Sequence, residues 1–173
     1  MSKQKIRAEL IEARKMLPAS EVDLKSRIIT DKFLELVDWS SVRSLCMYKS
    51  VSSLKEVETS QLFLNLTDKH PEICVAVIEP KISAKVPTEK FDLILVPVVG
   101  FDKKLNRLGM GGGFYDRFLT RQPQALKIGL AYSLSFIKED VDWEPHDVAL
   151  DIIITEKGII VKRESNSHKN QAN

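Results

Sequence analysis

The sequence contains few cysteines and no long apolar run, and both absences limit what the protein can be. Its two cysteines, Cys46 and Cys74, are too few for a cysteine-based metal site, and each lies in an apolar run. We therefore predict two buried, reduced thiols, as is usual in a reducing compartment. No apolar segment approaches the roughly 20 residues that a membrane-spanning helix needs, and the polar start Met1–Lys5 has no apolar signal core. The prediction is a cytoplasmic protein without a membrane partner.

The sequence also has little excess of either charge. The formal net charge of the 173 residues is only +2, and no long run of lysine or arginine occurs, which argues against nucleic acid as a partner. A hydrophobic content of 43% is enough for one core. Since neither a repeat nor a linker interrupts the chain, we predict a single domain over residues 1–163 and a polar, disordered tail over 164–173. We expect a monomer that binds small molecules.

The spacing of apolar residues predicts helices that alternate with strands. The predicted helices cover residues 2–17, 20–37, 56–69 and 114–121, and the predicted strands cover 42–48, 73–78, 91–99, 125–131, 151–155 and 159–161. The run at 73–78 is apolar throughout, which is typical of a strand covered on both faces. This order predicts a three-layer α/β domain, Rossmann-like, in which helices flank a mainly parallel central sheet.

The first two helices are each predicted to bury one face. The apolar residues at helical spacing in the first helix are Ile6, Leu10, Ala13 and Leu17, and Ile11 widens the stripe. In the second helix they are Leu24, Ile28, Leu34 and Val37, with Ile29 and Phe33 alongside. On the other face of the first helix, Arg14 and Lys15 are predicted to be solvated. Ser20 is the predicted N-cap of the second helix, because a serine side chain can accept a hydrogen bond from a free N–H of the first turn.

Glycine is also infrequent, but four of the seven glycines fall within the stretch Gly109–Gly113. This stretch follows an apolar strand and precedes a helix start, where converging backbone N–H groups bind anions. Arg107 and Arg117 flank it, and the cations of Lys3–Arg7 oppose the dipole of their own helix unless an anion compensates them. We therefore predict a phosphate-bearing ligand. The spacing is neither a dinucleotide fingerprint nor a Walker A loop, and a tight turn without a ligand is the alternative.

Aspartates near the glycines are candidate ligands for Mg²⁺, which prefers carboxylate, phosphate and water oxygens. The candidates are Asp102, Asp116, Asp147 and Asp151. Asp116 follows the glycines in the first turn of a helix, where its alternative role is to compensate the helix dipole. The alternative for Asp147 is a turn or cap, and Asp151 is assigned a structural role at a strand start. His146 is a candidate ligand contact, whereas His70 is assigned to a turn.

Two neighbouring stretches resemble the signature of a known family. Pro97–Asp102 is followed by Asn106–Arg117, and together they resemble the 5-formyltetrahydrofolate cyclo-ligases, also called methenyltetrahydrofolate synthetases. Three further segments match in the same order: Lys3–Arg7, Glu56–Thr59, and His146–Asp151 running into Ile154–Glu156. The resemblance spans nearly the whole chain apart from the tail.

The resemblance implies a fold like that of the NagB/RpiA/CoA-transferase group and a reaction that depends on ATP and Mg²⁺. In that reaction 5-formyltetrahydrofolate is cyclised to 5,10-methenyltetrahydrofolate, with release of ADP and phosphate, through a phosphorylated formyl intermediate. Catalysis of this kind rests mainly on positioning and charge neutralisation. This type of catalysis agrees with the sequence, in which no Ser/His/Asp or Cys/His arrangement for a protein nucleophile is evident.

The resemblance also implies roles for individual residues. Arg107 and Tyr115 would act in catalysis, and Asp116 and Asp147 would hold the Mg²⁺. The residues implied to contact ATP are Lys3, Arg7, Arg107, Gly109, Met110, Gly111, Gly112, Gly113, Phe114 and Tyr115. The residues implied to contact the folate are Lys49, Glu56, Met110, Gly111, Gly112, Gly113 and Phe114.

The sequence departs from this family between its second and third predicted strands. The family has a longer segment there, with another strand that contributes to the folate pocket, whereas the connector at 80–90 is short. Two alternatives to a cyclo-ligase therefore stay open. One is a non-catalytic or altered relative that binds nucleotide or folate, and the other is an enzyme acting on sugar phosphates or coenzyme A on a similar scaffold.

Overall fold

The computed structural model describes residues 2–79 and 86–162, so the predictions for the tail and for part of the connector lie outside the described residues. Six strands form one sheet in the order β2-β1-β3-β6-β7-β8. The strands are β1 (Ser44–Tyr48), β2 (Cys74–Ile78), β3 (Leu93–Pro97), β6 (Leu126–Leu130), β7 (Ile152–Thr155) and β8 (Gly158–Val161). Neighbouring strands are parallel except for β7 and β8. The predicted α/β fold with a mainly parallel sheet is confirmed.

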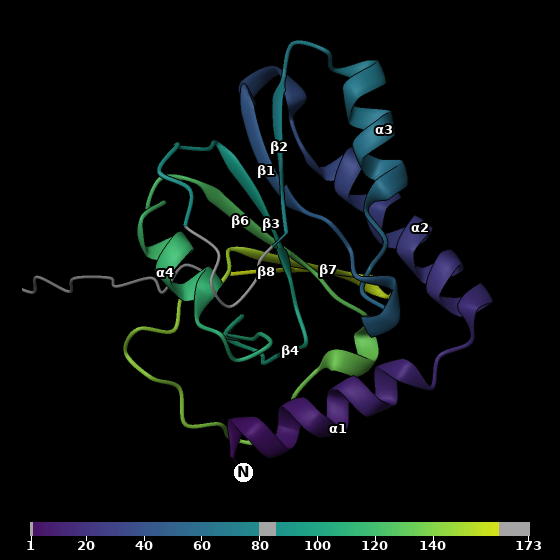
Figure 1. Ribbon diagram of the computed structural model, residues 1–173, viewed down its shortest axis with the longest axis vertical. Coiled ribbons are helices and arrows are strands. Elements are labelled where there is room, and N and C mark those ends of the chain that lie inside the picture. The colour runs from purple at the N-terminus through teal and green to yellow at the C-terminus, as the bar shows by residue number, and fades with distance from the viewer. Residues whose placement is uncertain (1, 80–85, 163–173) are drawn as a thin grey trace, which may run out of the picture.

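Helices cover both faces of this sheet. The α-helices of the described residues are α1 (Lys3–Lys15), α2 (Ala19–Leu36), α3 (Ser60–Lys69) and α4 (Phe114–Thr120). Figure 1 shows α2 and α3 together on one side of the sheet and α4 on the other. Successive strand residues point to opposite faces, so Leu45 and Met47 belong to the core that includes Ile29 and Phe33 of α2, whereas Cys46 lies in a second core. The second core also contains Phe114, Tyr115, Phe118 and Leu119 of α4.

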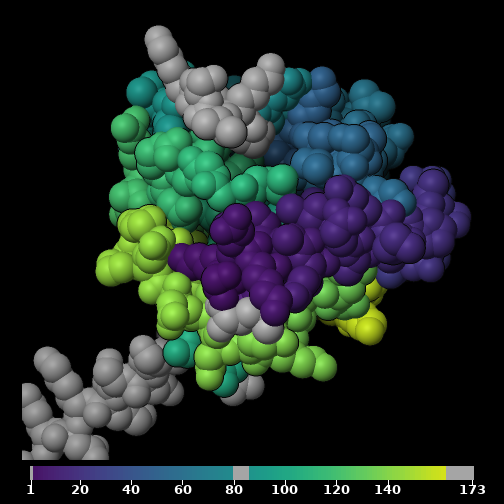
Figure 2. Space-filling view, turned by 60° about the horizontal axis from the view of Figure 1, so that its bottom comes forward, coloured from purple at the N-terminus to yellow at the C-terminus, as the bar shows by residue number. Residues whose placement is uncertain are grey.

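The first helix lies on neither face of the sheet. Figure 1 shows α1 crossing the end of the molecule toward which β3 runs, and Figure 2 shows it (purple) spread across that end. Ile6 packs there with Leu108 and Ile137 in a small third core. The approach is close: a Cβ at Gly100 would lie 2.5 Å from Leu10 Cδ1, so a larger residue there would force that side chain to shift. The N-terminus of α1 is thereby held at the carboxyl end of the parallel strands, where α/β sheets bind ligands.

The sequence did not indicate a small hairpin that follows β3. β4 (Gly100–Phe101) pairs antiparallel with β5 (Arg107–Leu108). Three short 3₁₀ helices, Trp39–Ser41, Ser52–Leu54 and Ser133–Ser135, were not predicted either. In the described part of the chain, no helix is long and apolar enough to cross a membrane.

The predicted start of the third helix is wrong. α3 begins at Ser60, and residues 56–59 are not helical. Tertiary hydrogen bonds hold this segment instead: Tyr48 Oη donates to the Val57 carbonyl (3.0 Å), and Thr59 Oγ1 donates to the Tyr48 carbonyl (2.8 Å). Since the segment's polar groups are satisfied by the rest of the protein, its local helix preference does not decide its conformation.

The predicted N-cap of the second helix is wrong. The N-cap is Pro18 rather than Ser20, with no capping side-chain hydrogen bond.

Most of the predicted core face of this helix is confirmed. Ile29 and Phe33 are buried, and Leu34 and Val37 pack against the same core. Leu24 is an exception, since it is 59% exposed.

Three predictions about burial fail for identifiable reasons. Cys74 is exposed, because β2 is an edge strand of the described sheet; Cys46 is buried as predicted, and burial raises the pKa of its thiol to about 12. Arg14, predicted to be solvated, is only 3% exposed, while Ala13 is exposed. The helix thus turns Arg14, rather than Ala13, toward the interior.

Candidate active site

One cleft of about 960 Å³ lies where α1, the glycine stretch and the loops after β1 and β3 meet. It is lined by every residue to which the family resemblance assigned a role. These are Lys3, Arg7, Lys49, Glu56, Arg107, Gly109, Met110, Gly111, Gly112, Gly113, Phe114, Tyr115, Asp116 and Asp147. The cleft brings residues from distant parts of the chain to one place, and their individual roles stay predictions.

The glycine stretch turns sharply at the N-terminus of α4. Gly111 has φ 93° and Gly113 has φ 64°, a left-handed region that side chains disfavour. Arg7 of α1 lies against this turn: its Nε donates to the Gly109 carbonyl at 2.6 Å, and a Cβ at Gly111 would lie 3.2 Å from its Cζ. Glycine is therefore required at Gly111 both by its backbone conformation and by the neighbouring guanidinium.

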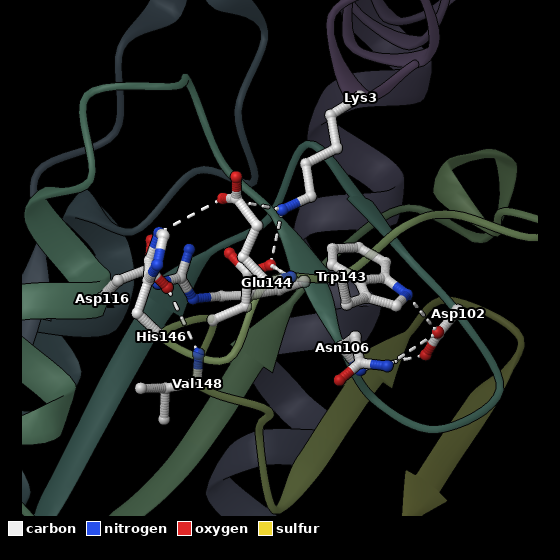
Figure 3. A network of polar contacts seen from close by, with 10 residues as sticks. Lys3, Asp102, Asn106, Asp116, Trp143, Glu144, His146 and Val148 are labelled. Carbon is white, nitrogen blue, oxygen red and sulfur yellow. Dashed lines mark hydrogen bonds and ion pairs between the residues drawn. The ribbon is translucent and has the colours of Figure 1, made fainter. Parts of the chain in front are cut away.

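Arg107 and Asp116 form an ion pair beside this turn. Arg107 Nη2 donates to Asp116 Oδ1 at 2.7 Å, and the same oxygen accepts a weaker bond from the backbone N–H of Val148 at 3.3 Å (Figure 3). The Arg107 side chain is 4% exposed. Burial lowers the pKa of Arg107, whereas the charge of Asp116 acts in the opposite direction. Its guanidinium also lies over the ring of Tyr115, 5.6 Å from the ring centroid.

Lys3, from the N-terminus of α1, reaches two carboxylates of the segment 143–147. Its Nζ lies 2.5 Å from Asp147 Oδ2 and 3.3 Å from Glu144 Oε2 (Figure 3). It also lies 5.4 Å from the ring centroid of Trp143. Burial opposes ionisation of Asp147, but the hydrogen bonds from Lys3 and from the Glu144 N–H hold its pKa below the ordinary value. Both aspartates predicted to hold a metal are thus paired with cations predicted to contact ATP.

The donor atoms present fit a hard divalent cation. One ligand atom each from Glu144, His146 and Asp147 lies within 4.8 Å of the others. The charges of Asp116 and Asp147 both act on Arg107, so the two carboxylates share one electrostatic environment. Carboxylate oxygens beside an anion-binding loop are the ligand set that Mg²⁺ prefers.

The remaining metal candidates have other roles. Asp102 accepts hydrogen bonds from Asn106 Nδ2 and Trp143 Nε1, both at 2.9 Å, and it does not line the cleft (Figure 3). It orders the hairpin loop and ties it to the segment 143–147. Asp151 accepts a bond from the Lys127 backbone N–H at 2.8 Å, in agreement with its predicted structural role.

Glu56 lies in a largely buried position at the cleft wall. It is 9% exposed, and its Oε2 accepts a hydrogen bond from the Val51 N–H at 2.8 Å. Burial raises the pKa of Glu56, although the Val51 bond and the charge of Arg14 act in the opposite direction. Lys49, in contrast, is exposed and pairs with Glu79 at 2.7 Å. Of these two predicted folate contacts, Glu56 is the one fixed by the protein interior.

Sequence reasoning missed several residues of the cleft. They include Tyr48, Val51, Val98, Trp143 and Glu144. Trp143 and Glu144 directly precede the matched segment that begins at His146, which is the one signal that would have indicated them. The apolar residues carry no such signal, because a strand residue that lines a cleft has the same composition as one that fills a core.

The fold and the cleft define an α/β protein that presents a glycine loop, cations and carboxylates beyond its parallel strands. A model of the 5-formyltetrahydrofolate cyclo-ligase family matches residues 71–156. A 5-formyltetrahydrofolate cyclo-ligase of Mycoplasma pneumoniae is 30% identical, with 91% of this chain and 100% of that protein covered. One of Haemophilus influenzae is 28% identical, with 88% and 97% covered. The chain belongs to the 5-formyltetrahydrofolate cyclo-ligase family.

Solved structures agree with this assignment. A 5,10-methenyltetrahydrofolate synthetase from Mycoplasma pneumoniae superimposes with a TM-score of 0.76 at 26% identity, covering 90% of this chain and 99% of that chain. A 5,10-methenyltetrahydrofolate synthetase from Aquifex aeolicus has a TM-score of 0.79 over 99% of this chain and 100% of that chain. At 24% identity, the second likeness supports the fold alone.

Proposed function

We propose that this protein is an ATP- and Mg²⁺-dependent 5-formyltetrahydrofolate cyclo-ligase. One observation carries the proposal. In a chain that belongs to the cyclo-ligase family, a single cleft brings together the glycine loop, four cations, two aspartates and a buried glutamate that the family resemblance assigns to ATP, metal and folate. These groups come from α1, the loop after β1, the β5–α4 region and the segment 143–147.

The reaction needs ATP because the formyl oxygen of the substrate is a poor leaving group. In the proposed sequence this oxygen attacks the γ-phosphorus of ATP, and the bond between that phosphorus and ADP breaks. N10 of the folate then attacks the formyl carbon and loses its proton. The carbon–oxygen bond breaks as phosphate leaves, and the ring is closed. Such a reaction needs alignment and charge neutralisation more than a protein nucleophile.

The cations of the cleft supply the charge neutralisation. Arg7 is held against the glycine loop, and Arg107 is buried, where its charge acts more strongly than in water. Tyr115 supplies a neutral hydroxyl, because burial raises its pKa well above the ordinary value. That hydroxyl is buried without a hydrogen-bond partner among the described residues, so it retains a donor for the reaction.

Asp116 and Asp147 would hold the Mg²⁺. When bound, the ion would reduce the repulsion between the ATP phosphates and an approaching oxygen. Asp116 uses Oδ1 for Arg107, and Asp147 uses Oδ2 for Lys3. In the described residues no hydrogen bond occupies the second oxygen of either carboxylate, so each retains a free ligand atom.

The direct test is spectrophotometric detection of methenyltetrahydrofolate formed from 5-formyltetrahydrofolate with ATP and Mg²⁺. We expect product formation that requires all three components. Folded protein that binds nucleotide but forms no product above background would overturn the cyclo-ligase proposal. It would instead favour a relative that only binds nucleotide or folate.

Replacing Lys3 with Ala is expected to raise the KM for ATP about tenfold, because a charge-assisted hydrogen bond to phosphate contributes about 1.5 kcal/mol. The matched control is Lys5→Ala. Lys5 lies on the same helix and pairs only loosely with Glu9 at 4.0 Å, and it does not line the cleft. Steady-state kinetics over a range of ATP concentrations measure both variants. An ATP KM of Lys3→Ala that equals that of Lys5→Ala would limit Lys3 to its ion pairs with Asp147 and Glu144.

A further inference from the structure

Two buried hydroxyl groups hold the backbone on either side of Glu56. Tyr132, which is 1% exposed, donates from Oη to the Glu56 carbonyl at 3.1 Å. Because the hydroxyl of Tyr132 has a single proton, Ser26 Oγ is the donor in its 3.3 Å contact with Tyr132 Oη. Ser26, on α2, also accepts the Glu58 N–H at 3.0 Å. Buried polar groups are costly to leave unpaired, so this chain of bonds fixes the backbone at residues 56 and 58.

The residue between them is held by a third hydroxyl. Tyr48 Oη donates to the Val57 carbonyl at 3.0 Å. Tyr48 lines the cleft, whereas Tyr132 and Ser26 do not. Tyr132 therefore supports Glu56 from the protein interior, where it would not touch a ligand in the cleft.

The loop that begins with Tyr132 is fixed in turn by Glu156. Glu156 follows β7, and its Oε2 accepts the Ser133 N–H at 2.8 Å, while its Oε1 accepts the Ser133 hydroxyl at 2.6 Å. Lys32 of α2 donates to the Glu156 carbonyl at 2.8 Å. Bonds to an ionised carboxylate are stronger than bonds between neutral groups. Glu156 also ends the segment Ile154–Glu156, which resembles the family but has no role in the chemistry described above.

The carboxylate of Glu56 depends on the backbone that these hydroxyls hold. Its Oε2 accepts the Val51 N–H at 2.8 Å, and Glu56 lines the cleft. Its Oε1 has no hydrogen-bond partner among the described residues, so it is available to a ligand. A displaced backbone would move both oxygens, and small misplacements of groups that orient a substrate have large effects on the reaction.

We infer that Tyr132 is a positioning residue that holds Glu56 in place for the folate, and that Glu156 holds Tyr132 in turn. This inference rests on the proposed function, in which Glu56 contacts the folate. Neither Tyr132 nor Glu156 lines the cleft, so both would act on the substrate through Glu56. The contacts run from the end of β7 through the loop after β6 to the cleft wall.

The first experiment needs no substrate. Amide hydrogen exchange of Val51 and Glu58 is followed by NMR in ligand-free protein. Tyr132→Phe, which keeps the ring and removes only the hydroxyl, is expected to speed both exchange rates about fivefold, because a buried hydrogen bond of the segment is lost. The Val51 amide is the decisive reporter, since it bonds to the Glu56 carboxylate and not to Tyr132. An unchanged Val51 exchange rate would overturn the inference.

The matched control is Trp39→Phe. It likewise removes a donor to a backbone carbonyl, the bond from Trp39 Nε1 to Leu34 at 3.0 Å, and Trp39 does not line the cleft. Its Val51 and Glu58 exchange rates should stay within about twofold of wild type. Equal acceleration in Trp39→Phe and Tyr132→Phe would show a general loss of stability and would also overturn the inference.

The second experiment separates the two substrates by steady-state kinetics. Tyr132→Phe is expected to raise the KM for 5-formyltetrahydrofolate about fivefold, with the KM for ATP within about twofold of wild type. Isothermal titration then tests the route through Glu56. In a Glu56→Ala background, Tyr132→Phe should change the affinity for 5-formyltetrahydrofolate less than about twofold. Equal increases in both KM values, or full additivity with Glu56→Ala, would contradict a positioning role.

The role of Glu156 has its own test. Glu156→Ala should speed Val51 exchange and raise the folate KM, and Glu156→Gln should do so less, because its amide oxygen can still accept a bond from Ser133. Adding Glu156→Ala to Tyr132→Phe should change the folate KM by less than about a further twofold. Independent, multiplying effects would mean that Glu156 does not act through Tyr132.

Two further outcomes keep the inference testable. If Tyr132→Phe does not fold, Ser26→Ala replaces it, since this change removes the partner of both Tyr132 and Glu58; Val51 exchange as slow as in wild type would then overturn the inference. If wild-type protein forms no methenyltetrahydrofolate, the proposed function fails. Hydrogen exchange in ligand-free protein then still decides whether Tyr132 fixes the position of Glu56.

Discussion

The Asp116→Asn variant is expected to form methenyltetrahydrofolate at least about 100-fold more slowly than wild type, because it loses a proposed ligand of the Mg²⁺ that would neutralise the reacting phosphates. The variant should also need a higher Mg²⁺ concentration for half-maximal rate. The measurements are the rate over a range of Mg²⁺ concentrations and, independently of activity, the affinity for Mg²⁺ in the presence of a non-hydrolysable ATP analogue.

We expect Asp116→Asn to affect the stability of the fold less than it affects the reaction rate. An asparagine retains an oxygen that accepts a hydrogen bond from Arg107, so we expect a loss of unfolding free energy of about 1–2 kcal/mol. The matched control is Asp102→Asn, which weakens the bonds from Asn106 and Trp143 but lies outside the cleft. It should lower stability by a similar amount and keep the Mg²⁺ dependence. A wild-type rate and Mg²⁺ affinity for Asp116→Asn would remove its metal role.

The Gly111→Val variant is expected to weaken ATP binding about 100-fold. Backbone strain at φ 93° costs about 1–3 kcal/mol for a residue with a side chain. The first added carbon would also lie 3.2 Å from Cζ of Arg7, so the guanidinium must shift against the loop. Both effects act on the groups proposed to hold the phosphates. Isothermal titration with ATP and Mg²⁺ measures the loss.

The control for this variant is Gly158→Val. A Cβ at Gly158 meets nothing within 4 Å, and its φ is not in the left-handed region. The Gly158→Val variant should bind ATP with wild-type affinity. Both variants should remain folded; Gly111 lies in an exposed turn. If Gly111→Val keeps its ATP affinity, the stretch is a tight turn and not a phosphate site.

The sheet could be predicted well because its signals are local. The apolar runs around Leu45, Cys74, Leu93, Leu126 and Ile152 each became a parallel strand, since a strand covered on both faces needs apolar residues at successive positions. The glycine stretch was equally visible, because its backbone conformation requires residues without a side chain. The edge position of β2 was not visible, so the exposure of Cys74 could not be predicted.

The pairing of charges could not be predicted in this way. Lys3 and Asp147 are 144 residues apart in the chain, and they meet only because α1 crosses the end of the sheet. A helical pattern places Arg14 on a polar face, and polar faces are usually solvated. Its burial depends on what covers that face, which helical spacing does not contain.

The amino-acid sequence by itself determined the α/β class, the glycine turn and the family to which the chain belongs, because these depend on residue types at short, regular spacing. Only the tertiary structure decided that Glu56 lies outside a helix, that Arg14 is buried, and that Asp116 and Asp147 are paired with Arg107 and Lys3. The reason is physical: burial and electrostatic pairing depend on distances between segments, and those distances exist only after the sheet and α1 have packed.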